Sequence, residues 1–250
     1  MKRAIAGVVL VATLAVAAAA TRPFWVAPDA AQAQSWLRDA ADRRDAGAEA
    51  ALARWSGRGN AEARHAYATL LSHRADAGSR EHLAQVLAAG ADAGDAADAT
   101  RLAELLAHAG APATGTDASR ADARIARLLA QGSAGHVAAA TRLLALRSLD
   151  PAHGTPDAAR AATLMAQAAQ GGDAPAMFLY ANMLRAGQGV ARDDAQALAL
   201  YQAAGDADYA PAIQALAIAW RYGELGLQAD ASQSRLMDHE AAEALAHAAH

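Results

Sequence analysis

The chain of 250 residues contains no cysteine. Disulfides, thiolate metal sites and cysteine nucleophiles are therefore excluded, and so is a bacterial lipoprotein anchor, which requires a cysteine at its processing site. Lysine occurs once, at Lys2, so arginine carries nearly all of the basic charge. Residues 34–250 hold 19 arginines against 25 acidic residues, a formal charge of −6. This acidic body has no basic run, which argues against binding of nucleic acid.

Large side chains are also scarce. The chain has two phenylalanines and seven prolines, and no aromatic residue lies between Tyr67 and Phe178. About a third of the residues are alanine, the strongest helix former, so helix is expected almost everywhere. The middle of the chain must then pack through alanine and leucine. We expect a modest core there, with lower local stability than in the C-terminal third.

The first residues have the pattern of an export signal. Lys2 and Arg3 precede an uncharged apolar run at residues 4–20, and Arg22 follows it. A positively charged start before an apolar run is typical of a secretory signal. The positive end stays inside the cell, so the rest of the chain is expected outside the cytoplasm.

Two outcomes for this signal stay open. Small residues that suit cleavage occur at Ala18-Ala19-Ala20 and again at Ala31-Gln32-Ala33. Alternatively, residues 4–20 are retained as a membrane anchor, with Phe24-Trp25 at the membrane interface. Residues 1–33 are therefore expected to be a signal peptide or an uncleaved anchor. The protein is then periplasmic or secreted, or is anchored in the inner membrane and faces the periplasm.

A stretch of 20 residues returns 36 positions later in the C-terminal third. GDAPAMFLYANMLRAGQGVA begins at Gly172, and DYAPAIQALAIAWRYGELGL begins at Asp208. Six residues return unchanged: Ala174, Pro175, Ala176, Ala181, Arg185 and Gly187 recur as Ala210, Pro211, Ala212, Ala217, Arg221 and Gly223. A fixed period of this length indicates stacked repeats, in which each unit buries its apolar face against a neighbour.

Weaker periodicity extends upstream. Glycines at intervals of 33 to 40 residues each precede an alanine-rich helical pattern, and they predict left-handed turns between helices: Gly59, Gly94, Gly132, Gly172 and Gly205. Asp117, Asp157 and Asp193 stand before alanine/leucine stripes. We expect these aspartates to cap helix N-termini, because a carboxylate accepts the unpaired N–H groups of a first turn.

One unit resembles a known family. It begins at Gly172 and has a small residue at Ala181, a G-x-G-V turn at residues 187–190, and an Asp-x-x-x-Ala-x-x-x-Tyr pattern from Asp193 to Tyr201. This unit is similar to a Sel1-like repeat, a relative of the tetratricopeptide repeat. The resemblance implies an all-α, right-handed solenoid of helix pairs over residues 34–250, weak in 34–171 and clear in 172–250. It also implies a concave face used mainly for contact with other proteins.

Helical periodicity selects the residues that would line this face. Tyr180, Ala181 and Leu184 fall on the packed side of one repeat, and Leu216, Ala217 and Trp220 do so in the next. The opposite stripe is the predicted partner-binding site: Phe178, Asn182, Arg185, Gln214, Ile218, Arg221 and Tyr222. Arginine and aromatic side chains are enriched at binding hot spots, and an extended acidic peptide or chain terminus would suit this stripe. Ordinary half-buried positions are the alternative interpretation.

No catalytic or metal site is predicted. His239 and Glu243 are spaced i,i+4, with His247 and His250 further along. Such spacing can place metal ligands on one face, but histidine would have to replace Glu243 for a zincin motif, and we favour an exposed capping helix. Nucleophile elbows, phosphate-binding loops and dinucleotide fingerprints are absent from the sequence. No cofactor is expected.

The sequence therefore favours an exported, non-enzymatic adaptor or scaffold that binds protein partners. Among exported members, the family resemblance suggests roles in cell-envelope assembly, including exopolysaccharide secretion, or in binding cell-wall enzymes. Two alternatives stay open. One is a secreted hydrolase related to β-lactam-hydrolysing repeat proteins, although those carry disulfides and this chain has no cysteine. The other is a self-associating structural module.

Overall fold

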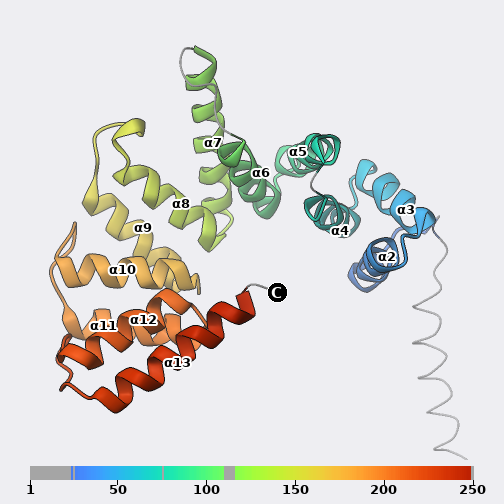
Figure 1. Cartoon of the computed structure of the whole chain (residues 1–250). Helices are drawn as coiled ribbons and strands as arrows, with labels where there is room; N and C mark the ends of the chain where they lie inside the picture. Colours follow the sequence, from blue (N-terminus) through green and yellow to red (C-terminus); the bar gives the residue numbers. More distant parts are fainter. Residues whose placement is uncertain (1–23, 25, 75, 110–115, 249–250) are drawn as a thin grey trace, which may run out of the picture. The chain divides into compact units, whose positions relative to one another are not determined.

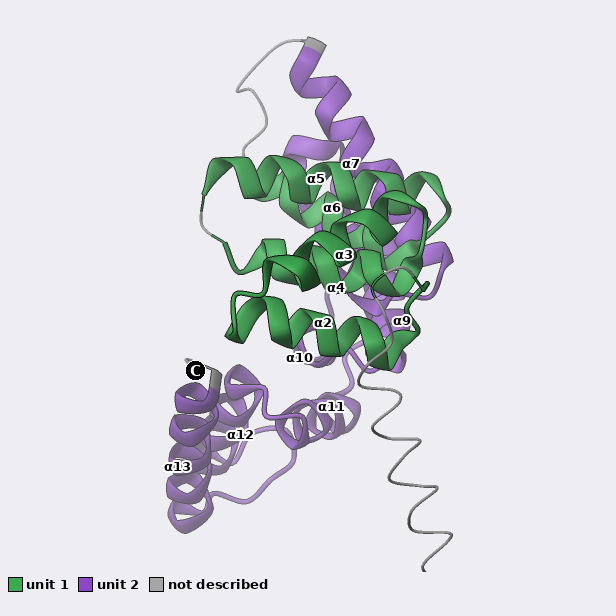
Figure 2. Cartoon of the chain, turned by 90° about the vertical axis from the view of Figure 1, so that its right-hand side faces the viewer, with its two compact units in different colours: residues 1–110 green, residues 111–250 purple. Residues whose placement is uncertain are grey.

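The computed structural model describes residues 24, 26–74, 76–109 and 116–248 (Figure 1). These residues form α-helices and one short 3₁₀ turn, and the described part contains no β-strand. The predicted all-α fold is confirmed. The chain divides into two compact units, residues 1–110 and residues 111–250 (Figure 2).

Unit 1 consists of consecutive helices that pack against their neighbours along the chain. The helices are α2 (Ala30–Asp42), α3 (Ala46–Gly57), α4 (Ala61–Ser72), α5 (Ala77–Asp92) and α6 (Ala96–His108). Large buried side chains fill the space between them: Trp36, Leu52, Tyr67, Leu71, Leu87 and Leu102. Unit 1 thus has a core of its own.

Unit 2 continues the same construction, with each helix packed on the next (Figure 1). Its helices are α7 (Thr116–Ala134), α8 (Ala138–Leu149), α9 (Ala158–Gln170), α10 (Ala174–Ala186), α11 (Asp194–Asp206), α12 (Ala210–Tyr222) and α13 (Ala231–Ala248), with the 3₁₀ turn η1 (Pro151–His153) after α8. The pairs α8/α9, α10/α11 and α12/α13 follow one another at intervals of 36 residues between their first positions. The predicted stack of helix pairs is confirmed.

Helix starts follow the capping chemistry expected from the sequence. The Asp157 carboxylate accepts the Arg160 N–H at 2.9 Å, and Asp193 accepts the Gln196 N–H at 2.9 Å. Both were predicted N-caps and are confirmed. Asp117 was expected to be a third, but α7 begins one residue earlier, so Asp117 lies in its first turn.

Two of the five glycines predicted to form left-handed turns do not form them. Gly132 and Gly205 were predicted to form left-handed turns but lie inside α7 and α11. The residues with positive φ before the next helix pair are Gly59, Gly94, His136, Gly172 and Asp208. A short polar side chain or a histidine can adopt this conformation at some cost. The left-handed conformation therefore recurs at the same position of each repeat, and glycine is the commonest residue there.

The turn at residues 187–190 closes the clear repeat. Gly187 ends α10 in a left-handed conformation with φ of 66°. Gly189 also has positive φ, and a β-carbon there would lie 2.0 Å from the carbonyl oxygen of Ala158. Val190 then packs against the apolar clusters on both sides. Glycine at position 189 is required because the backbone of α9 approaches the turn this closely.

The two apolar clusters of unit 2 differ in the size of their side chains. The cluster around α8–α10 is built on alanines and two methionines, Met165 and Met183. The cluster around α10–α12 contains Tyr201, which is fully buried, with Phe178 and Tyr209 packed against it. Packing of the middle of the chain through small residues is as predicted. Its lower local stability stays a prediction.

Most of the predicted signal segment lies outside the described residues, which include only Phe24 and residues 26–33 of it. The Phe24 ring packs edge-on against Trp36 at 5.3 Å, and its carbonyl accepts a hydrogen bond from Trp55 Nε1 at 2.9 Å. Phe24 is therefore held on unit 1. The predicted cleavage motif at residues 31–33 lies within α2, where Ala33 is buried. Within the part of the chain that is described, no helix is both long and apolar enough to cross a bilayer.

Candidate functional site

The predicted binding stripe lies on α10 and α12, each of which is the first helix of a pair. We call such a first helix helix A; the other helices A are α4, α6 and α8. Positions are counted from the first residue of each helix A. The packed side is as predicted: Ala181, Leu184, Leu216 and Ala217 are buried, while Tyr180 and Trp220 are partly exposed. Met183 and Ala219 are buried as well. The stripe occupies positions 5, 9 and 12 of α10 and α12, with Tyr222 at position 13 of α12.

On α10 the stripe is tied to the next helices by aromatic contacts. The Phe178 ring lies 5.7 Å from the Tyr201 ring and 5.6 Å from the Tyr209 ring. The Tyr201 hydroxyl donates a hydrogen bond to Asn182 Oδ1 at 2.6 Å. Burial raises the pKa of Tyr201, so the hydroxyl stays protonated and can donate. Phe178 and Asn182 are therefore already engaged in holding α10 against α11.

Both predicted arginines have a carboxylate partner within unit 2. Arg185 pairs with Glu224 at 2.8 Å, and Arg221 pairs with Asp238 at 2.6 Å. All four side chains are substantially exposed to solvent. Exposed pairs of this kind contribute little to stability, about 0–1 kcal/mol. The two guanidinium groups therefore remain accessible to an outside carboxylate that competes with the internal one.

On α12 the stripe is open. Gln214, Ile218 and Tyr222 are spaced i, i+4 and i+8, and all three are exposed. The exposed fraction is 43% for Ile218 and 68% for Tyr222. A partner that covers these two side chains would remove their apolar surface from water, which favours binding. The open part of the stripe is thus an apolar pair next to Arg221.

The histidines near the C-terminus are spread along an exposed helix. His239 Nε2 lies 3.6 Å from Glu243 Oε1, and both side chains are mostly exposed. His247 lies further along α13, and His250 is outside the described residues. The i,i+4 pair is the arrangement predicted from the spacing.

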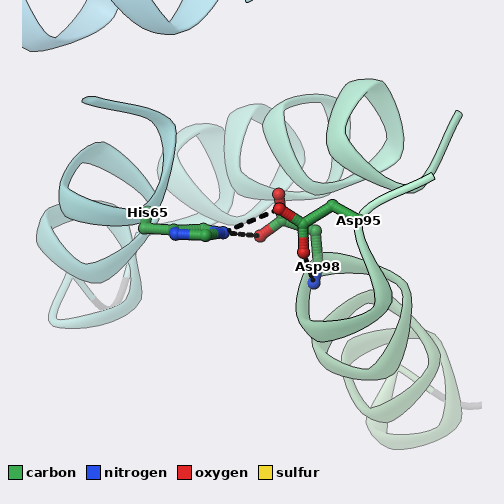
Figure 3. A group of neighbouring side chains, drawn as sticks. All are labelled: His65, Asp95 and Asp98. Carbon is green, nitrogen blue, oxygen red and sulfur yellow. Dashed lines mark hydrogen bonds and ion pairs between the residues drawn. The ribbon is translucent and has the colours of Figure 1, made fainter. Parts of the chain in front are cut away.

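Unit 1 contains a charged cluster that the sequence analysis did not single out. Arg64 on α4 is buried and donates from Nε to Asp98 Oδ2 at 2.5 Å and from Nη2 to Asp95 Oδ2 at 2.8 Å. His65 Nε2 lies 2.9 Å from the same Asp95 oxygen. The other Asp95 oxygen caps α6 by accepting the Asp98 N–H at 3.1 Å. Two carboxylates and one imidazole thus meet at the start of α6 (Figure 3), and the Arg64 guanidinium contacts both carboxylates.

The contacts in the cluster shift the pKa of Arg64 and that of Asp95 so that each favours its charged form. Burial alone lowers the pKa of Arg64, but the hydrogen bonds and charges of Asp98 and Asp95 outweigh it, and the net pKa is raised. Burial alone raises the pKa of Asp95, and the Asp98 N–H, Arg64 and His65 together bring it below its usual value. Both groups are therefore charged at neutral pH.

The Asp95 contact follows a pattern that repeats along the chain. Position 5 of one helix A reaches the N-cap residue of the next helix A. His65 meets Asp95 in this way, and Arg142 Nε lies 2.8 Å from Asp173 Oδ1. Phe178 packs against Tyr209 at the corresponding place. The predicted stripe therefore begins at a position whose side chain links consecutive repeats.

Asp98 breaks the repeat. Position 3 of the other helices A is alanine, and each of these alanines is fully buried: Ala63, Ala140, Ala176 and Ala212. Asp98 is equally buried, with 0% exposure. The space for its carboxylate comes from Gly90, where a β-carbon would lie 1.9 Å from Asp98 Oδ2. The matching positions, four residues before the left-handed residue, are Ala168 and Ala204 in the last repeats.

This exception could have been found in the sequence. Asp98 lies four residues after Gly94, as Ala176 lies four residues after Gly172. The spacing of the glycines was enough to align these two positions. The signal is an acidic residue at a position that is otherwise alanine. Asp98 was not singled out, because it lies near a helix start, where a capping role can explain a carboxylate.

The fold and these surfaces define an α-solenoid repeat protein, built from helix pairs with about 36 residues each. Comparison with solved structures identifies the kind of repeat. A Sel1 repeat protein from Oxalobacter formigenes superposes with a TM-score of 0.66 and 16% identity, covering 78% of this chain and 75% of that one. The predicted Sel1-like repeat is therefore confirmed at the level of the fold.

A second solved structure gives the same result. It is c5321, a protective antigen of uropathogenic Escherichia coli strains that displays the Sel1-like repeat fold, with a TM-score of 0.65 and 19% identity. The alignment covers 86% of this chain, which spans about half (51%) of the length of c5321. No family model matches the sequence, and no curated protein matches it. Both structures are distant in sequence, so they identify the fold.

Proposed function

We propose that this protein is an exported adaptor without catalytic activity, which binds a protein partner through the helix A stripe of α10 and α12. The main support for this proposal is the exposed pair Ile218 and Tyr222 on α12, at 43% and 68% exposure, next to Arg221. Rigid aromatic and arginine side chains around an apolar contact are typical of binding hot spots. Repeat stacks present such faces because consecutive first helices lie side by side.

The partner we favour is an extended segment with acidic side chains. Arg185 and Arg221 already hold the carboxylates of Glu224 and Asp238 in solvent-exposed pairs. A partner carboxylate can replace either internal acid at little net cost, because exposed pairs are weak. Ile218 and Tyr222 would then supply apolar burial that the ion pairs lack. Binding is expected to weaken as salt rises, because the exposed charges are screened.

The test is quantitative capture from native envelope with cross-linking and mass spectrometry. Wild type is compared with an Ile218→Ser, Tyr222→Ala double variant and with an Arg185→Ala, Arg221→Ala double variant. The matched control removes two exposed leucines of α13, Leu236→Ser with Leu245→Ser. We expect at least about a tenfold loss of the captured partner for both stripe variants, with unchanged melting temperature, and none for the control. Equal capture by all four proteins would contradict the proposal that the stripe binds the partner.

Export is proposed from the charged and apolar pattern of residues 2–22, and we place cleavage after Ala20. The alternative site after Ala33 would remove the first turn of α2, including the buried Ala33 and the capping Asp29. It would also remove Phe24, whose ring packs on Trp36. N-terminal sequencing of protein isolated from the envelope distinguishes the outcomes. A start at Thr21 agrees with the proposal, whereas a start at Gln34 or an intact N-terminus contradicts it.

A further inference from the structure

We infer that His65, Asp95 and Asp98 form a site for a divalent transition-metal ion of the zinc type at the start of α6. One imidazole and two carboxylates point toward one another from α4 and α6 (Figure 3). Imidazole nitrogen and carboxylate oxygen are both zinc ligands, and three protein ligands leave a fourth position for water. This site is separate from the stripe proposed to bind a partner.

The spacing of the donor atoms suits a small tetrahedral ion. His65 Nε2 lies 2.9 Å from Asp95 Oδ2 and 3.6 Å from Asp98 Oδ1. Ligands at about 2.0–2.2 Å from a tetrahedral zinc ion are roughly 3.3–3.5 Å apart. The two distances fall on either side of that value, and all three donor atoms lie within 4.8 Å of one another.

One donor lacks any other partner. Asp98 Oδ1 is buried and has no hydrogen-bond partner among the described residues, and the His65 nitrogen at 3.6 Å is beyond hydrogen-bond reach. A buried carboxylate oxygen without a partner is costly, commonly about 1–3 kcal/mol or more. The cost is accepted at a position where the other helices A have alanine. A cation between Asp98 Oδ1 and His65 would satisfy this oxygen.

The surroundings provide both support and access. Arg64 donates to Asp98 Oδ2, on the far side of that carboxylate from His65, and to Asp95 Oδ2, the oxygen that also faces His65, and so fixes the orientation of both carboxylates. Groups that hold metal ligands in this way raise affinity by orienting them. The Asp98 side chain is fully buried, but the His65 side chain is 40% exposed. An ion can therefore enter from solvent on the His65 side.

The experiment titrates the metal-free, full-length protein with zinc chloride by calorimetry and repeats it with cobalt, whose visible absorption reports tetrahedral coordination. The test variant is His65→Gln, which removes one ligand at a partly exposed position. The matched control is His239→Gln, which removes the histidine of the exposed His239–Glu243 pair. Circular dichroism checks that each variant is folded.

We expect one tight zinc site per chain in wild type and in His239→Gln, and at least about a tenfold weaker affinity in His65→Gln. Zinc should raise the melting temperature of wild type and of the control, and not that of His65→Gln. Equal affinity of wild type and His65→Gln overturns the assignment. So does the absence of saturable binding, or a melting temperature that depends on His65 only through pH, which would make the cluster a proton-linked ion pair.

Discussion

Units 1 and 2 bury opposite chemistry at the same positions of the repeat. In unit 1, position 3 of α6 is Asp98, with Arg64 against it and Gly90 beside it. In the last repeats of unit 2, the matching pairs are Ala168 with Ala176 and Ala204 with Ala212, each pair within one apolar cluster, and in its first repeat Gly132 matches Ala140. A helix stack can therefore accommodate a buried ion pair where the neighbouring helix loses a methyl group. The missing methyl group of Gly90 leaves the room that the Asp98 carboxylate occupies.

The same comparison shows how the two units link consecutive repeats. In unit 1 the contact between position 5 and the next N-cap is polar, His65 with Asp95, whereas unit 2 has one ion pair, Arg142 with Asp173, and one aromatic contact, Phe178 with Tyr209. An aromatic contact buries area without a cost of desolvating charge. A charged one needs every partner in place. Unit 1 should therefore respond more strongly to single substitutions and to pH.

The largest effect is expected for Gly90→Ala. The added methyl group would lie 1.9 Å from Asp98 Oδ2 and 2.6 Å from Arg64 Nε, so the buried ion pair must separate. We expect a loss of about 3 kcal/mol in the free energy of unfolding, measured with urea. The control is Gly57→Ala, where a β-carbon meets no atom within 4 Å. Loss of the same size in the control would contradict the mechanism.

Converting the charged site to the alanine pattern is the second test. Asp98→Ala alone leaves buried Arg64 with only Asp95, and we expect a loss of about 2–3 kcal/mol. The triple variant Gly90→Ala, Asp98→Ala, Arg64→Met copies Ala204, Ala212 and Met177 of unit 2, which lie in one apolar cluster. Its stability should return to within about 1 kcal/mol of wild type, because apolar replacements of buried ion pairs are often neutral. Additive losses in the triple variant would show that the positions are independent.

Low pH should destabilise the charged contact at Asp95, whereas an aromatic contact has no group that titrates in this range. The pKa of Asp95 is lowered in the folded protein, so its contribution is complete above the ordinary carboxyl pKa of about 4 and is lost as pH falls through the lower folded value. Asp95→Asn keeps a capping side chain but removes this charge. Urea midpoints measured between about pH 3 and pH 6 should fall less steeply for this variant than for wild type. Parallel curves would exclude Asp95 as a source of the slope.

The smallest effect concerns the turns between repeats. Unit 1 uses Gly59 and Gly94 at the left-handed position, whereas unit 2 uses Asp208 at one of its turns, with φ of 56°. Asp208→Gly should stabilise by about 0.5–1 kcal/mol, because glycine adopts this conformation without strain. The reverse change, Gly172→Ala, should destabilise by a similar amount. Thermal melting of the two variants measures both effects. Changes in melting temperature of the same sign would contradict the role given to the left-handed conformation.

Much of the fold was accessible from the sequence because it depends on local chemistry. Alanine content and the 36-residue period predicted stacked helix pairs, and Asp157 and Asp193 were recognised as caps. Two of the turns were harder to predict, because the left-handed residues there are His136 and Asp208 and not glycines. The stripe residues lie on the predicted face of α10 and α12, but the periodicity could not show that Phe178 and Asn182 contact Tyr201. The use of the stripe in binding stays a prediction.

The sequence by itself determined that the chain is helical, that its helices repeat in pairs and which face of each helix is apolar, because propensity, capping and periodicity act within one turn or one repeat. Only the tertiary structure decided where charge is buried. Arg64, Gly90 and Asp98 come from three helices, and that they meet is known only once those helices are packed. Packing also left Asp98 Oδ1 without a partner beside His65, and no local pattern in the sequence reports such a distance.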